Sequence, residues 1–222
     1  ITFLRKNHWK EHYSLSLELY ELASSCALTN GDVVILRLLS EQVVTFGRSF
    51  EDKLNVMYYA TCALASSSKL PEAISKGIGI LGKLGIDLQG HDLSMEDCLQ
   101  ETKNLLSGYT DNEILNSRQM VDPTMIVAMK FLGKLEIAMT QTSPLSVPHV
   151  AQKIIHLSLS YGMSPVSPIG FVYFGASLAK LGNIDEGYHY VKLALSLLDK
   201  VGSRENAGEV IAIGTQVRAY VE

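Results

Sequence analysis

Apolar residues recur at intervals of three and four along almost the whole chain, the spacing that aligns them on one face of an α-helix. Near the start of the chain, one apolar stripe consists of Leu15, Leu19, Leu22 and Cys26 and ends at the turn residues 30–31. No segment alternates with a period of two residues for long enough to predict a strand. The pattern therefore predicts an all-α protein of about 10–11 helices.

Capping residues mark where these helices begin. Asp32 is a typical N-cap, and the helix after it has apolar residues at Val34, Leu38, Leu39 and Val43. Further helix starts, each with a polar capping residue or a first-turn proline, are predicted at 51–52, 70–71, Ser94, Asp111, 122–123, 167–168 and 183–185, with a final helix from 203 or 204. Because the turns between paired helices are short, we expect those helices to pack antiparallel.

One helix pair near the C-terminus has the spacing of a tetratricopeptide repeat. Small residues at Gly175 and Gly187 would let the two helices approach closely, while large residues one turn away would fill the space between pairs. The residues expected to pack this repeat are Phe171, Phe174, Gly175, Leu178, Gly182, Gly187, Val191 and Ala194.

Two earlier segments show the same pattern less completely. Aligning the small position of the second helix gives Leu36, Ala73 and Gly187, which are 37 and 114 residues apart, the latter being three times 38. These spacings slightly exceed the ~34 residues of the standard repeat. We therefore expect a right-handed superhelix of antiparallel helix pairs, a TPR-like α-α solenoid; the alternative is an irregular helical bundle.

The domain organisation expected from this pattern is one helical-repeat domain covering 1–222. It comprises two helix pairs in 1–85, an irregular connector with short helices in 86–121, and two helix pairs plus a final helix in 122–222. The chain begins at Ile1 rather than at a methionine, and its last residues keep a helical pattern. We interpret it as a fragment of a longer protein.

Composition narrows the classes of function. The charged fraction is 19%, the formal net charge is −4 and the mean hydropathy is +0.15, which favours a large core or an apolar surface that meets another domain. Lys and Arg are not clustered, so nucleic-acid binding is not expected. No apolar run approaches the ~18 residues of a membrane span. The three cysteines are far apart, which favours buried free thiols in a reducing, cytoplasmic compartment over disulfides.

Two short motifs suggest chemistry that we do not expect here. His8, Glu11 and His12 fit H-x-x-E-H, which on a helix places two imidazoles one turn apart for zinc, but no third ligand is recognisable. The glycines at 77, 79 and 82 fit G-x-G-x-x-G, but no strand precedes them, so close helix packing is the simpler interpretation. No catalytic residue, metal or other cofactor is therefore predicted.

Several short blocks resemble the TPR-like helical region of large multidomain signalling proteins. The blocks are 9–20 (WKEHYSLSLELY), 69–74 (KLPEAI), 81–86 (LGKLGI), 120–123 (MVDP), 129–132 (MKFL) and 158–162 (SLSYG). Proteins of this architecture combine a serine/threonine kinase-like domain, a signal-transducing ATPase, a GAF domain and a sensor histidine kinase or other output. The resemblance implies that the kinase and ATPase activities lie outside this segment.

We therefore expect a non-catalytic interaction and regulatory scaffold that couples neighbouring domains of such a protein or binds a protein partner. The repeat geometry predicts a concave groove. The groove candidates are Glu18, Glu21, Asn55, Tyr58 and Lys180. The alternative is a sensor module that binds a small effector or peptide and relays the change to an attached ATPase or kinase. The sequence leaves the partner and the oligomeric state open.

Overall fold

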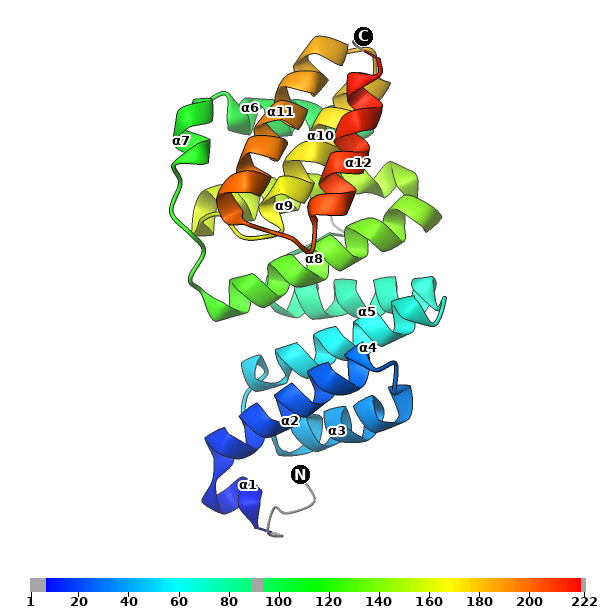
Figure 1. Ribbon diagram of the computed structural model, residues 1–222, viewed down its shortest axis with the longest axis vertical. Coiled ribbons are helices and arrows are strands. Elements are labelled where there is room, and N and C mark those ends of the chain that lie inside the picture. Colours follow the sequence, from blue (N-terminus) through cyan, green and yellow to red (C-terminus); the bar gives the residue numbers. More distant parts are fainter. Residues whose placement is uncertain (1–6, 89–93, 221–222) are drawn as a thin grey trace. The chain divides into compact units, whose positions relative to one another are not determined.

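The computed structural model describes residues 7–88 and 94–220, and these form an all-helical protein (Figure 1). Within these ranges there are twelve α-helices, two 3-10 helices and no strand, so the predicted fold class is confirmed as all-α. The chain divides into two compact units, 1–77 and 78–222, where the sequence pattern had suggested one domain. Part of the predicted connector, 89–93, lies outside the described residues, as do 1–6 and 221–222.

The first unit holds the N-terminal helices, and the division between the units falls within α5. Its elements are α1 (His8–Glu11), α2 (Tyr13–Thr29), α3 (Val33–Phe46), η1 (Glu51–Lys53), α4 (Leu54–Ser66) and the first half of α5 (Leu70–Lys83). The short α1 was not predicted, because four residues are too few to show helical periodicity.

The second unit holds the remaining helices. They are α6 (Met95–Leu106), α7 (Asp111–Leu115), α8 (Pro123–Thr142), η2 (Pro144–Ser146), α9 (Val147–Tyr161), α10 (Ser167–Lys180), α11 (Ile184–Val201) and α12 (Ala207–Arg218). The final helix, predicted from 203 or 204, begins at Ala207. The region expected to be a connector includes α6, which packs on α9 and so belongs to the body of this unit.

Side-chain caps fix several helix starts where the sequence predicted them. The Asp32 carboxylate accepts a hydrogen bond from the Ile35 N–H, and the Ser94 hydroxyl accepts one from the Asp97 N–H. α7 begins at Asp111, as predicted, and Thr110 caps it in a capping box with Glu113. These bonds satisfy N–H groups that have no partner within the helix.

The buried face of α2 is not the predicted apolar stripe. Leu15 and Leu22 are 52% and 61% exposed, and Cys26 is exposed as well. The residues that α2 buries are Ser16, Tyr20, Ser24 and Ala27. Small side chains let the neighbouring helices approach closely, and the Ser24 hydroxyl donates to the Tyr20 carbonyl at 2.7 Å, so its burial leaves no donor unpaired. The prediction that all three cysteines are buried is therefore wrong for Cys26.

The helix α3 departs from its predicted stripe in the same way. Val34 and Leu38 are exposed, and the residues buried are Leu36, Ser40 and Val43. Val43 joins a core cluster with Trp9, Tyr20 and Val56, whereas Leu36 packs with Ala27 and Ala63. Most residues of α3 are apolar, so the sequence alone did not determine which face of the helix is buried. Contacts with α2 and α4 determine the buried face.

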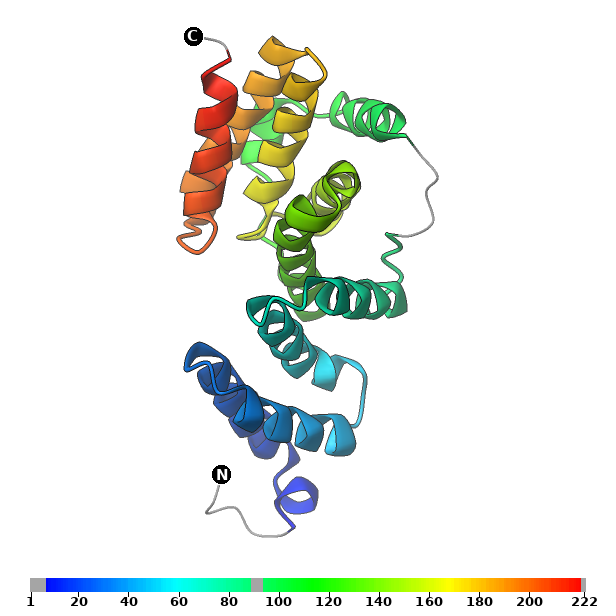
Figure 2. The ribbon, with the colours of Figure 1, turned by 90° about the vertical axis from the view of Figure 1, so that its right-hand side faces the viewer.

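The second unit is organised around the close crossing of α10 and α11. A Cβ added at Gly175 would lie 2.5 Å from the Gly187 carbonyl oxygen, and one added at Gly187 would lie 2.5 Å from the Gly175 oxygen. Neither backbone could stay where it is with a larger residue. Beside this crossing Phe171, Phe174 and Val191 are fully buried. Figure 2 shows α10, α11 and α12 side by side.

The other predicted repeat residues lie in or next to this packing. Leu178 and Ala194 are buried in the second unit, and Gly182 forms the turn between α10 and α11 with a positive φ of +89°. Such a backbone conformation favours glycine. In the first unit Ala73 is buried on α5.

Replacing Gly175 by alanine is expected to lower the free energy of unfolding of the second unit by about 1–3 kcal/mol, because the new Cβ forces the α10–α11 crossing apart. Urea denaturation followed by far-UV circular dichroism measures the effect. The only tryptophan, Trp9, lies in the first unit, so its fluorescence reports that unit separately and its transition should not move.

The matched control is Gly208→Ala on α12, where an added Cβ meets no atom within 4 Å. It should leave stability unchanged or raise it by up to about 1 kcal/mol. A Gly175→Ala protein that unfolds at the same urea concentration as the native chain and the control would contradict the close crossing.

Candidate functional site

Four of the five predicted groove residues lie on α2 and α4, two helices of the first unit that contact each other. The Asn55 amide donates a hydrogen bond to the Glu21 carboxylate at 3.2 Å, so these two side chains already satisfy each other. Burial raises the pKa of Glu21, and the negative charges of Asp52 and Glu18 raise it further, against the hydrogen bond from Asn55. Tyr58 is half-buried, with its ring centroid 5.9 Å from that of Tyr59.

The fifth groove residue, Lys180, is exposed at the end of α10 in the second unit. The first unit therefore presents a polar α2–α4 face that includes Glu18, Glu21, Asn55 and Tyr58. This face is acidic, but its polar side chains Asn55 and Glu21 are already hydrogen bonded to each other.

The H-x-x-E-H residues do not share one continuous helix. α1 ends at Glu11, and His12 has φ −136° and ψ 55° at the break before α2. The His8 ring is buried, with Nδ1 2.9 Å from the Ser16 hydroxyl oxygen and its ring stacked on Tyr20 at 5.7 Å. His8 therefore packs into the first unit, whereas the sequence pattern alone had favoured a solvated helix face for it. Among the described residues no group of three or more His, Cys, Asp or Glu side chains is arranged to hold a metal ion.

The glycine motif at 77, 79 and 82 lies inside α5, with no strand before it. A Cβ added at Gly79 or Gly82 would meet no atom within 4 Å. Close helix packing, which the sequence suggested for these glycines, is thus wrong at both positions.

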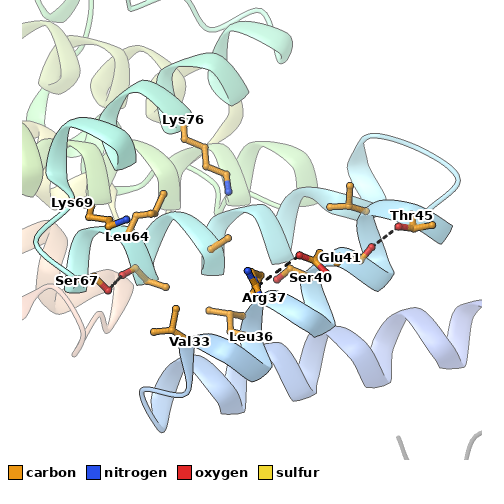
Figure 3. Close-up of a pocket in the computed structure, with 13 residues that line it drawn as sticks. Val33, Leu36, Arg37, Ser40, Glu41, Thr45, Leu64, Ser67, Lys69 and Lys76 are labelled. Atoms are coloured by element: carbon orange, nitrogen blue, oxygen red, sulfur yellow. Dashed lines mark hydrogen bonds and ion pairs between the residues drawn. The ribbon is translucent and has the colours of Figure 1, made fainter.

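A cavity of about 480 Å³ lies within the first unit between α3, α4 and the start of α5 (Figure 3). Most of its surface is contributed by apolar atoms, although seven of its thirteen lining residues have polar or charged side chains. The lining residues are Val33, Leu36, Arg37, Ser40, Glu41, Val44, Thr45, Ala60, Ala63, Leu64, Ser67, Lys69 and Lys76.

The floor and the rim of this cavity differ in character. The floor contains the buried residues Leu36, Ser40 and Ala63. On the rim Arg37 and Glu41 form an exposed ion pair at 3.8 Å along α3. An apolar floor with a polar rim is typical of a site for a small amphipathic molecule.

Ser40 is the only residue of the lining with a buried hydroxyl that has no hydrogen-bond partner among the described residues. Serine and threonine inside helices usually donate to the carbonyl four residues earlier. In the same lining Thr45 donates to the Glu41 carbonyl at 2.7 Å, and Ser67 donates to the Ala63 carbonyl at 2.8 Å. A buried hydroxyl without a partner costs about 1–3 kcal/mol, so Ser40 marks a place where a ligand atom would be stabilised.

Lys76 is the second unusual residue of the lining. Desolvation by the surrounding protein lowers the pKa of its ammonium group. No ion pair or hydrogen bond joins Lys76 to another of the described residues, whereas Lys69 pairs with Glu72 at 3.7 Å. In Figure 3 the Lys76 side chain extends from α5 toward α3 and α4.

Sequence reasoning missed both Ser40 and Lys76. A partial signal exists for Ser40, because it follows Leu36 by four residues and so occupies the core face of an apolar helix. Nothing in the local sequence distinguishes Lys76 from other exposed lysines, because its role depends on which helix lies opposite.

The second unit contains a buried carboxyl cluster that the sequence also did not reveal. Glu136 on α8 is fully buried beside the carboxyl group of Glu209 on α12, and its Oε2 atom has no hydrogen-bond partner among the described residues. Thr140 donates to Glu136 at 2.9 Å, and the Tyr173 hydroxyl donates to Glu209 at 2.9 Å. Burial, then the neighbouring Glu209, raises the pKa of Glu136 to about 9. One of the two carboxyl groups therefore holds a proton at neutral pH.

This cluster should make the stability of the second unit depend on pH. The pKa of Glu136 is higher in the folded protein than the ~4.3 of an unfolded chain, so folding retains a proton that unfolding releases. The stabilisation is complete below about pH 4 and is lost as the pH rises toward 9. Urea denaturation at pH 5, 7 and 9, followed by circular dichroism, should show stability falling with pH.

The variant Glu136→Gln should flatten this dependence, because its neutral amide does not titrate. The control Glu205→Gln, at an exposed position, should keep the native pH dependence. If Glu136→Gln and native protein lose stability in parallel between pH 5 and 9, the buried proton is not at Glu136.

Comparisons with protein-family models, curated proteins and solved structures find no match to this chain. No helix within the described part of the chain is long and apolar enough to cross a membrane.

Proposed function

We propose that the chain is a non-catalytic interaction and regulatory scaffold that couples neighbouring domains of a multidomain signalling protein. We further propose that its helix pairs form a TPR-like superhelix. The antiparallel pairs and the close Gly175–Gly187 crossing support this arrangement, and the blocks that resemble signalling proteins support the context.

The observation that carries the proposal is the apolar surface of α3. Six of its fourteen residues are large apolar side chains that are at least 43% exposed. They are Val33, Val34, Ile35, Leu38, Val44 and Phe46. A concentration of this kind on one helix is typical of a surface that a protein partner covers.

The α3 surface is a better candidate than the α2–α4 face predicted from the repeat. Covering exposed valine and leucine side chains gains about 25 cal/mol for each Å² of apolar surface removed from water. On the α2–α4 face, a partner would have to compete with the existing bond between Asn55 and Glu21 and would desolvate acidic groups.

A second candidate function is a sensor module that binds a small effector and relays the change to an attached ATPase or kinase. The cavity of about 480 Å³ in the first unit favours it, since small-molecule sites usually enclose 300–1,000 Å³ and have a few polar groups on apolar walls.

The double variant Val34→Asp, Leu38→Asp should weaken partner binding at least tenfold, because two carboxylates would be desolvated where two apolar side chains were covered. The tagged chain is used to capture binding proteins from cells that express it. A partner identified by mass spectrometry is then purified, and its affinity for each variant is measured by biolayer interferometry.

Val121→Asp is the matched control, since Val121 is 80% exposed and lies in the second unit. It should bind like the native chain. If the partner still binds the α3 variant but no longer binds the variant Glu18→Lys, Glu21→Lys, Tyr58→Ala, the interface lies on the α2–α4 face instead. A chain that binds no protein saturably would refute the scaffold function.

A further inference from the structure

We infer that the cavity between α3, α4 and α5 binds a small amphipathic monoanion, a carboxylate with an unbranched apolar tail, whose head group meets Lys76 and Ser40. This inference rests on the sensor alternative and deepens it by naming the ligand class. Val34 and Leu38, the two residues changed to test the α3 surface, do not line the cavity, whereas Val33 and Val44 belong to both.

The walls of the cavity fit the tail of such a ligand. Leu36 and Ala63 are buried in the floor, and the apolar side chains of Ala60, Leu64 and Val44 continue the wall. An alkyl chain placed against them needs no hydrogen-bond partner and gains from leaving water. A peptide backbone would instead bring N–H and C=O groups that these side chains cannot satisfy.

The charges of the lining select an anion. Three cations, Arg37, Lys69 and Lys76, face one carboxylate, Glu41. Arg37 is paired with Glu41, and Lys69 is paired with Glu72 outside the lining. Lys76 has no such counter-charge among the described residues; its residue remains exposed to solvent, while partial desolvation lowers the pKa of its ammonium group. The single unpaired cation, Lys76, therefore matches a ligand that carries one negative charge.

Ser40 supplies the second recognition element. Ser40 is only 9% exposed and lies in the floor of the cavity. Its hydroxyl has no hydrogen-bond partner within the described structure. It can donate to a carboxylate oxygen, a bond that neither an alkane nor an ammonium head group accepts. An ammonium ligand would also meet repulsion from Lys76, and an alcohol would leave the lysine unpaired.

The test compares three probes with the same ten-carbon tail on the full chain: decanoate, decanol and decyltrimethylammonium, each below its micelle concentration. Isothermal titration calorimetry should show one decanoate bound per chain, at least tenfold more tightly than decanol, and no binding of the cation. Lys76→Met should weaken decanoate at least tenfold and leave decanol unchanged. Ser40→Ala should weaken decanoate severalfold.

Two further variants control for indirect effects. Lys180→Met removes an exposed lysine from the second unit and should bind decanoate like the native chain. Ala60→Phe should fill the cavity and abolish binding, while circular dichroism verifies that the helices remain.

Three outcomes would overturn the inference: no decanoate binding by the native chain, equal binding of decanol and decanoate, or native affinity in Lys76→Met. Tighter binding of a short apolar peptide with a free C-terminal carboxylate would replace the small-molecule assignment by a peptide site. The Val34→Asp, Leu38→Asp variant separates the two proposals, since it should lose the protein partner and keep decanoate binding.

Discussion

Small residues at helix crossings determine how closely the helices of this protein pack, and most of the structure follows from that constraint. In the second unit Gly175 and Gly187 bring the α10 and α11 backbones into direct contact, and buried phenylalanines fill the adjoining space. In the first unit α2 buries the small residues Ser24 and Ala27 beside Tyr20. Where two helices meet through small side chains, the crossing buries less apolar surface than it would with large side chains. The large apolar residues of those helices are then buried against other helices or remain exposed.

That consequence is clearest on α3. Its contacts with α2 and α4 use Leu36, Ser40 and Val43, which leaves valines, leucine and isoleucine on the outer face. The same placement directs Ser40 into a cavity in which its hydroxyl has no partner among the described residues. An exposed apolar helix and a partly polar cavity therefore arise from a single choice of buried face. We propose that the exposed apolar helix meets a protein partner and the cavity a small anion; Val33 and Val44 belong to both surfaces.

The second unit is built differently, because a polar group has been placed within its core. Glu136 on α8 lies beside Glu209 of α12, accepts a hydrogen bond from Thr140, and keeps its proton at neutral pH. Because Oε2 of Glu136 has no hydrogen-bond partner among the described residues, this network is only partly satisfied and lowers the stability of the second unit when Glu136 is charged. It also links the docking of α12 to proton concentration, which an apolar contact would not do.

The sequence by itself determined the helical class, most helix boundaries and the close packing partners Gly175 and Gly187, because these depend on local spacing, capping and residue size. Asp32, Ser94 and Asp122 cap helices where the local pattern predicted. Only the tertiary structure decided which face of α2 and of α3 is buried, because both helices have apolar residues on several faces. For the same reason the cavity with Ser40 and Lys76, and the Glu136–Glu209 pair, could not be predicted: each joins residues whose proximity depends on helices distant in sequence packing together.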